Sequence, residues 1–267
     1  MKINLKDTTF VFVIRLDSIE RLENLLIVIF NINKYFDTNI AIIEGANHNN
    51  SILASLLPRK VSYTFVNDMD DIFHRTVYYN RLTRENNTPI IAIWDSDTII
   101  DKKSIMEAVN ILRSRQADIA YPYNGIVYQT SDILRRYYLN TKDIKVLYKN
   151  LNKLDFLYNQ PMYGGAVFVN RNKYIDAGME NERHYGWGNE DYDRYNRFKN
   201  LGYNIYRVDT PLFHLCHPRK ENSSFRSKIF HQISSNELYR ISNISKEELL
   251  DYIILNHLNT NNFKRKC

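Results

Sequence analysis

Short apolar segments rich in β-branched residues alternate with segments of helical periodicity through the first half of the chain. Each apolar segment has the length of a strand and is apolar enough to be buried on both faces of a sheet. Strands that alternate with helices build a mostly parallel α/β sheet with right-handed crossovers. The sequence predicts strands at 10–14, 39–43, 61–66, 89–94 and 119–121, and helices that begin at Asp17, Asp70 and Asp101.

The second half of the chain is less regular. A Tyr-rich helical segment is expected over 132–158, and the glycine pair Gly164-Gly165 opens a further strand. A helix over 189–201 ends at Gly202, because glycine suits the left-handed conformation that follows a helix C-terminus. Since no linker or repeat interrupts these segments, the sequence predicts one continuous domain with a C-terminal helical extension.

The chain has 267 residues, a formal net charge of +6 and two cysteines, Cys216 and Cys267. Two cysteines cannot build a disulfide framework, which favours a reducing compartment. The apolar run from Leu25 to Phe30 is far shorter than the ~20 residues that cross a bilayer, and the N-terminus lacks the apolar core of a signal peptide. The positive charge favours an anionic partner: nucleic acid, an anionic membrane or a phosphorylated ligand.

Two carboxylates, Asp95 and Asp97, directly follow the most apolar predicted strand. Open parallel sheets bind ligands at the carboxyl ends of their strands. Carboxylates two positions apart on a turning backbone can converge on one divalent cation, which prefers oxygen ligands. The alternative is a loop whose aspartates only cap the next helix. The buried strand favours a ligand site, because carboxylates at its mouth carry a desolvation cost unless something compensates them.

Trp187 lies between two glycines, Gly186 and Gly188, and precedes the acidic pair Glu190 and Asp191. The glycines allow an unusual backbone and leave the indole uncovered for stacking on a sugar. The two acids fall in the first turn of a predicted helix, where the helix dipole favours the ionised form. A carboxylate held there can act as a general base toward a hydroxyl. The alternative is a buried tryptophan followed by ordinary acids at a helix N-terminus.

His214 and His217 flank Cys216 a few residues after a strand predicted at 203–208. In an extended segment the two imidazoles point to opposite faces, whereas in a turn both can reach one metal ion. The alternative is a pair of histidines that are only hydrogen-bonded. Cys216 fits a small buried residue better than a ligand.

Taken in this order, the segments resemble the nucleotide-sugar-dependent glycosyltransferases of the GT-A fold. The likeness is greatest to the β-1,4-galactosyltransferase-like branch and its bacterial capsule and cell-surface relatives, and it covers residues 10–219. It implies a GT-A domain over 1–219 and a helical extension over 220–267 packed on the same domain. The segments that carry the resemblance are 15–25, Phe73-His74-Arg75 with Asn80, Asp95-Ser96-Asp97, Pro161-Met162-Tyr163-Gly164-Gly165, Gly186-Trp187-Gly188-Asn189-Glu190-Asp191 and His217.

The resemblance implies a metal-dependent transfer from a UDP-sugar donor. Asp97 and His217 would bind Mn²⁺, or Mg²⁺, and His214, where those relatives have Met, would be a further ligand. The metal would bridge the diphosphate and stabilise the departing UDP. The implied donor contacts are Arg15 and Arg75 to the diphosphate, Asp95 to the ribose or donor, Glu44 to the uracil or ribose, Phe73 on the donor-contacting helix and Gly165 beside the donor sugar.

The same resemblance assigns roles in the transfer step. Asp191 would deprotonate the acceptor hydroxyl, so that direct displacement inverts the anomeric carbon. Trp187 would stack on the sugar, and Glu190 would hold sugar hydroxyls. Met162 stands where the animal galactosyltransferases have an aromatic residue, which leaves Gal, GalNAc and Glc open as the transferred sugar. Asn189 replaces a glycine of the family's motif and could change the local loop.

These implications predict an inverting glycosyltransferase that works on the cytoplasmic side of the membrane. It would add a sugar to a glycan or lipid-linked saccharide and so extend a surface glycan. A basic nucleic-acid-binding protein is the first alternative. The basic residues are scattered, apart from those at 264–266, so no nucleic acid is expected as a partner. The second alternative is a non-catalytic relative that binds sugar nucleotides. The intact Asp95-Ser96-Asp97 motif and the acidic pair Glu190 and Asp191 argue against this alternative. The remaining positive charge fits a solvated surface or a weak peripheral attraction to an anionic membrane.

Overall fold

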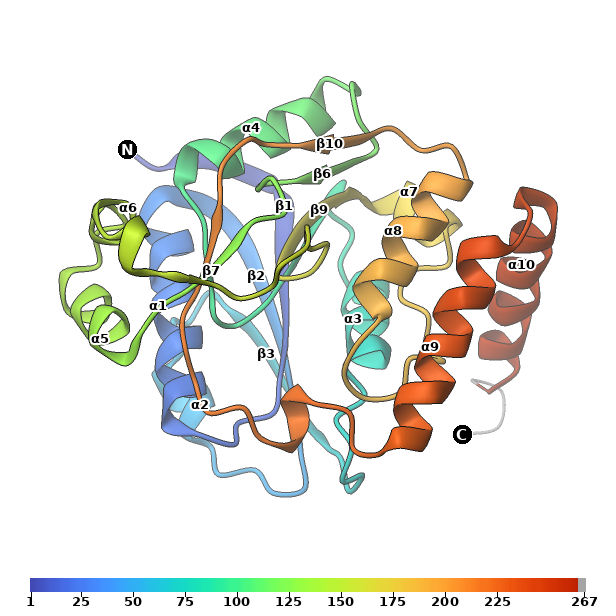
Figure 1. Cartoon of the computed structure of the whole chain (residues 1–267), viewed down its shortest axis with the longest axis horizontal. Helices are drawn as coiled ribbons and strands as arrows, with labels where there is room; N and C mark the ends of the chain where they lie inside the picture. Colours follow the sequence, from blue (N-terminus) through green and yellow to red (C-terminus); the bar gives the residue numbers. More distant parts are fainter. Residues whose placement is uncertain (264–267) are drawn as a thin grey trace.

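The apolar run predicted as a strand at 10–14 forms the C-terminal part of the long strand β1 (Ile3–Ile14), which lies within a seven-stranded sheet (Figure 1). The computed structural model describes the backbone of residues 1–263 and the side chains of residues 1–220 and 222–255. Within the seven-stranded sheet all pairings are parallel except those of β9, which runs antiparallel to both neighbours. The predicted mostly parallel α/β sheet is confirmed. The strands in order are β10 (Ile205–Arg207), β6 (Ile119–Tyr121), β9 (Ala166–Asn170), β4 (Ile90–Trp94), β1, β2 (Phe36–Ala46) and β3 (Ser62–Asn67).

The centre of the sheet is held by aromatic packing across three strands. Every residue of β4 is buried, as its continuous apolar sequence predicts. Phe10, Trp94 and Phe168 meet edge to face, with ring centroids 5.2–5.7 Å apart. Each such pair adds roughly 0.5–1.5 kcal/mol beyond the burial of its area. This packing fixes the carboxyl end of β4, from which the acidic motif continues.

Helix α1 (Ile19–Tyr35) lies on one side of β1 and β2, and α3 (Arg75–Glu85) lies on the other (Figure 1). The N-cap of α1 is Ser18, whose hydroxyl accepts a hydrogen bond from the Arg21 backbone N–H. The prediction that Asp17 caps this helix is wrong, because its carboxylate pairs with the Arg21 guanidinium at 2.9 Å instead.

Helix α3 begins at Arg75 and not at Asp70, so the predicted start of this helix is also wrong. The segment before it is a loop whose backbone carbonyls at Asp70 and Asp71 accept hydrogen bonds from Arg15. These carbonyls are therefore committed to a distant side chain and not to a helical turn.

A second, four-stranded sheet joins the carboxyl-end loops. The pairing at one edge of this sheet brings together two segments far apart in the sequence, because Thr98 lies opposite His214 in register. Residues on either side of this pair, including Asp97, are thereby held close together. The strands in order are β5 (Thr98–Ile99), β11 (Leu212–His214), β7 (Val127–Gln129) and β8 (Asp155–Phe156).

The remaining helices surround the two sheets, with α9 beside α8 and α10 outermost (Figure 1). In the part of the chain that the structure describes, no helix has both the length and the apolarity needed to cross a bilayer. The basic residues at 264–266 lie outside the described residues. The helices are α2 (Ile52–Leu56), α4 (Lys102–Arg113), α5 (Asp132–Thr141), α6 (Lys145–Lys149), α7 (Arg171–Asp176), α8 (Glu190–Asn200), α9 (Lys228–Asn243) and α10 (Lys246–Phe263), with 3₁₀ turns at Leu151–Lys153 and Glu221–Ser223.

Candidate active site

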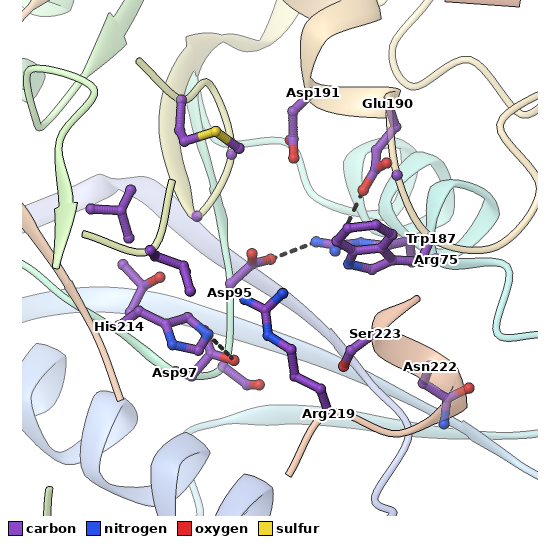
Figure 2. A pocket seen from close by; sticks show the side chains of 18 of the residues that line it. Arg75, Asp95, Asp97, Trp187, Glu190, Asp191, His214, Arg219, Asn222 and Ser223 are labelled. Carbon is purple, nitrogen blue, oxygen red and sulfur yellow. Dashed lines mark hydrogen bonds and ion pairs between the residues drawn. The ribbon is translucent and has the colours of Figure 1, made fainter. Parts of the chain in front are cut away.

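A cavity of about 300 Å³ lies at the carboxyl ends of β1 and β4 (Figure 2). Nearly all the residues predicted for the site line it, although they are spread along the sequence from Arg15 to His217. Glu44 is the exception among them, because its side chain is buried on β2 (Phe36–Ala46) and accepts a hydrogen bond from the Tyr63 hydroxyl at 2.7 Å. The predicted residues that line the cavity are Arg15, Phe73, Arg75, Asp95, Asp97, Met162, Gly165, Trp187, Glu190, Asp191, His214 and His217.

One wall of the cavity carries a carboxylate and two imidazoles. The Asp97 carboxylate lies 3.5 Å from His214 Nε2 and 3.2 Å from His217 Nε2. The chain turns after β11, where the Leu215 N–H bonds the Asp97 carbonyl at 2.8 Å, so both imidazoles reach the same carboxylate. Cys216 points away and donates to the Asp132 carboxylate. Burial raises the pKa of this thiol to about 11, which fits the expectation of a buried, non-ligating cysteine.

The Asp97 carboxylate of this cluster is held in its ionised form. Burial opposes ionisation of Asp97, but the charges and hydrogen bonds of His214 and His217 hold its pKa well below its usual range. Nδ1 of His217 lies 3.0 Å from the Pro218 carbonyl, so a proton on Nδ1 leaves the Nε2 lone pair free. The ligand atoms of the three residues lie within 4.8 Å of one another, close enough to share one ion.

Arg75 connects the acidic motif to the start of α8. Its guanidinium lies 2.5 Å from Asp95 and 3.4 Å from Glu190 (Figure 2). Burial raises the pKa of Glu190 to about 7; the Asp191 charge adds to this shift and the Arg75 charge opposes it. Near neutral pH the Glu190 carboxyl is therefore protonated part of the time and can both donate to and accept from a ligand hydroxyl.

Asp191 faces the cavity from the first turn of α8 (Figure 2). One carboxylate oxygen bonds Arg194 at 2.5 Å, and the other lies against Gly164. A Cβ at Gly164 would approach that oxygen to 2.4 Å, so glycine is needed there to leave room for the carboxylate. Burial raises the pKa of Asp191, which makes it a stronger base than an exposed aspartate.

The turn around Trp187 has the unusual backbone that its glycines predict. Gly186, Gly188 and Asn189 all adopt left-handed conformations, with φ of 93°, 103° and 69°. Asparagine is one of the few side chains that tolerates this region, so Asn189 preserves the turn where the resembled family has glycine. The indole of Trp187 is half-buried, packs edge to face on Phe225 at 5.5 Å and lines the cavity.

In a comparison with protein-family models, residues 12–257 match the family described as "Glycosyltransferase like family 2". The matched region contains every residue that lines the cavity. The chain belongs to the glycosyltransferase-like family 2. The mostly parallel sheet flanked by helices agrees with a GT-A glycosyltransferase. No curated protein matches the chain in the corresponding comparison.

The glycosyltransferase site also contains residues that the sequence did not single out. Arg219 extends into the cavity toward Asp95 (Figure 2), and no carboxylate in the described part of the chain pairs with it. Its position two residues after His217 was the only available signal. The other unpredicted lining residues include Arg21, Tyr158, Gln160, Tyr192, Asn222, Ser223 and Phe225.

Arg15 lines the glycosyltransferase cavity, but its guanidinium is already engaged. It donates to the Gly45 carbonyl at 2.9 Å and the Asp70 carbonyl at 2.8 Å, and it pairs with Asp68 at 2.6 Å. It also lies over the Phe73 ring. In the structure Arg15 therefore fixes the loop before α3, and its contact to a diphosphate stays a prediction.

A buried ionic network supports the turn that holds the acidic pair. The fully buried Asp193 carboxylate bonds His184 Nε2 at 2.8 Å and Arg197 Nε at 2.5 Å. Burial disfavours each charge, but the partners prevail, because the pKa of Asp193 is lowered to about 2 and that of His184 is raised above 6.5.

Because of this network, we expect the free energy of unfolding to be highest over an intermediate pH range and to fall at both lower and higher pH. The Asp193 contribution is present above its unfolded pKa of 3.8 and is lost as the pH falls toward about 2. The His184 contribution is present below its unfolded pKa of 6.5 and is lost as the pH rises through its raised folded value. Urea unfolding of the wild type and of His184→Gln across pH measures this. If the free energy of unfolding decreased by the same amount at alkaline pH in the wild type and in His184→Gln, the expectation would be contradicted.

Proposed function

We propose that this glycosyltransferase moves a hexose or N-acetylhexosamine (Gal, GalNAc or Glc) from a UDP-sugar to an acceptor hydroxyl, with inversion. The observation that carries the proposal is that the Asp97–His214–His217 cluster and the half-buried carboxylate of Asp191 face one cavity. The cluster offers a place for a metal-bound diphosphate. Asp191 would be the base that deprotonates the acceptor hydroxyl, and direct displacement requires that this hydroxyl attack the anomeric carbon on the side away from the leaving group.

The donor set of the cluster supports a bound Mn²⁺ in preference to Mg²⁺. One carboxylate oxygen and two imidazole nitrogens would hold the ion, whereas Mg²⁺ takes oxygen ligands and keeps several waters. The buried Nδ1 of His214 has no partner in the described structure, so that ring is held by packing and its contact to Asp97. A bound cation would supply Lewis-acid stabilisation of the UDP leaving group.

The other cavity residues would position the donor. Arg219 would contact the diphosphate oxygens, because it is the cation that reaches the cavity without a carboxylate partner in the described chain. Asp95, which Arg75 orients through a hydrogen bond, would accept hydrogen bonds from the ribose hydroxyls. Trp187 would stack on the sugar, and Glu190 would bind its hydroxyls.

Met162 would set tolerance at the sugar's 2-position. Its thioether sulfur accepts a hydrogen bond from the Tyr192 hydroxyl at 3.2 Å, and Gln160 donates to the same hydroxyl at 2.9 Å. These contacts hold an unbranched, adaptable side chain against the cavity. The proposal is that both a hydroxyl and an acetamido group fit there.

The acceptor proposed is a glycan or a lipid-linked saccharide of a cell surface, extended on the cytoplasmic side. A peripheral attraction of the basic surface to an anionic membrane would bring the enzyme to such an acceptor. No nucleic acid is proposed as a partner, because the cavity presents carboxylates beside its arginines.

Hydrolysis of a panel of UDP-, GDP- and CMP-sugars, with and without Mn²⁺, tests the proposal. We expect slow, Mn²⁺-dependent release of UDP from UDP-Gal, UDP-GalNAc or UDP-Glc. Hydrolysis of none of the UDP-sugars, or the same rate after chelation of the metal, would contradict it.

Arg219→Gln is expected to raise the donor KM about tenfold with little change in kcat, because the lost charge-assisted hydrogen bonds are worth about 1.5–3 kcal/mol. Lys199→Gln is the matched control, since Lys199 is exposed on α8 away from the cavity. Steady-state kinetics with the UDP-sugar chosen by the panel measures both. An unchanged KM in Arg219→Gln would remove Arg219 from the donor site.

A further inference from the structure

A second cavity, of about 420 Å³, lies behind the turn that carries Asp95 and Asp97. It is enclosed by α1, the start of α4 and the C-terminal end of α5 with the loop that follows. Its floor is apolar and buried, formed by side chains such as Val28, Ile32 and Ile105. No part of the proposed transfer reaction uses it.

The rim of this second cavity is basic. Four lysines line it: Lys102, Lys103, Lys142 and Lys145. In the described part of the chain none of them is in an ion pair. Two carboxylates also line the rim, but each binds a backbone amide: Asp101 accepts from the Lys103 N–H at 2.7 Å and Asp143 from the Lys145 N–H at 3.0 Å.

We infer that the second cavity binds an anionic amphiphile, a molecule with an aliphatic chain and a carboxylate or phosphate head. The chain would replace water on the apolar floor. The head would meet the ammonium groups of the rim, which have no carboxylate partner in the described part of the chain. Two of them, Lys102 and Lys142, also lie over the rings of Tyr35 and Phe30. A polar ligand without a chain would leave the floor in contact with water. A neutral chain would leave the lysines without a counter-charge.

The second cavity shares a wall with the candidate active site. Thr98 lines both cavities, and the Trp94 indole, which lines only the second, donates to the Thr98 carbonyl at 3.1 Å. These two residues bracket the turn that carries Asp95 and Asp97. Trp94 is also one of only two tryptophans in the chain, so its fluorescence reports on occupancy of this cavity.

Quenching of Trp94 by a brominated amphiphile tests the inference, without metal or sugar nucleotide, so its outcome is independent of the proposed transfer. Trp187→Phe leaves Trp94 as the single tryptophan. We expect ω-bromoundecanoate to quench its fluorescence saturably below the micelle-forming concentration, and neutral ω-bromoundecanol to bind several-fold more weakly. A parallel titration with vesicles of brominated phosphatidylglycerol distinguishes a membrane lipid from a free amphiphile as the source of the ligand.

Charge reversal on the rim provides the control. In the Trp187→Phe background, Lys102→Glu with Lys142→Glu is expected to weaken binding of ω-bromoundecanoate about tenfold. Lys199→Glu, which changes the net charge at an exposed position elsewhere, is expected to leave it unchanged. No quenching by either probe, or equal affinity in the rim variant and the control, would overturn the inference.

Discussion

Asp191→Asn is expected to lower kcat for sugar transfer by about 10²–10⁴-fold while leaving the affinity for the donor unchanged. The amide is close in size to the carboxylate and can still accept a hydrogen bond from Arg194, so the start of α8 is expected to remain in place. It cannot take a proton from the acceptor hydroxyl. The loss therefore falls on the transfer step and not on donor binding.

Transfer kinetics and UDP titration on the same preparation separate these two quantities. Asp176→Asn is the matched control, because Asp176 is exposed on α7 and outside the cavity. Because burial raises the pKa of Asp191, wild-type kcat should decrease as the pH falls through that raised value, where the base becomes protonated. Wild-type turnover in Asp191→Asn would exclude Asp191 as the base.

Arg197→Met is expected to lower the free energy of unfolding by about 3–5 kcal/mol, because the buried Asp193 carboxylate loses its guanidinium partner and keeps only His184. The Arg197 guanidinium also donates to the backbone carbonyls of Ala177 and Met179, which would lose their partners. Such a loss is a large part of the roughly 5–15 kcal/mol that stabilises a folded domain.

Urea unfolding measures the loss. Lys199→Met, two positions along the same helix and exposed, should change the free energy of unfolding by no more than about 0.5 kcal/mol. Equal losses in the two variants would show that the buried network contributes no more than a surface side chain.

The sequence predicted the sheet because burial determines its strands. The run at 89–94 was expected as a strand, and β4 occupies Ile90–Trp94 with every side chain buried. The start of α3 could not be predicted in the same way. Asp70 is a good local candidate for a helix cap, but its carbonyl is bound by Arg15 from a loop 55 residues away. Hydropathy patterns do not contain such long-range contacts.

In the candidate site, too, local motifs could be predicted from the sequence, whereas contacts between distant segments could not. Asp97 and His217 were expected because carboxylate and imidazole are metal ligands in motifs that occur in order along the chain. Their convergence depends on the pairing of β5 with β11, which the structure provides. Arg219 could not be found from the sequence, because its role depends on where the segment after β11 returns to the cavity and not on any local motif.

The most direct test of a metal-bridged donor site is UDP affinity, measured with and without Mn²⁺, for the wild type and Asp97→Ala, with Asp176→Ala as the control. We expect Mn²⁺ to strengthen UDP binding to the wild type and to Asp176→Ala at least about tenfold, a gain of roughly 1.4 kcal/mol. In Asp97→Ala, with the fold verified by circular dichroism, that gain should disappear. Equal UDP affinity in the wild type and Asp97→Ala, with and without Mn²⁺, would contradict the metal-bridged site.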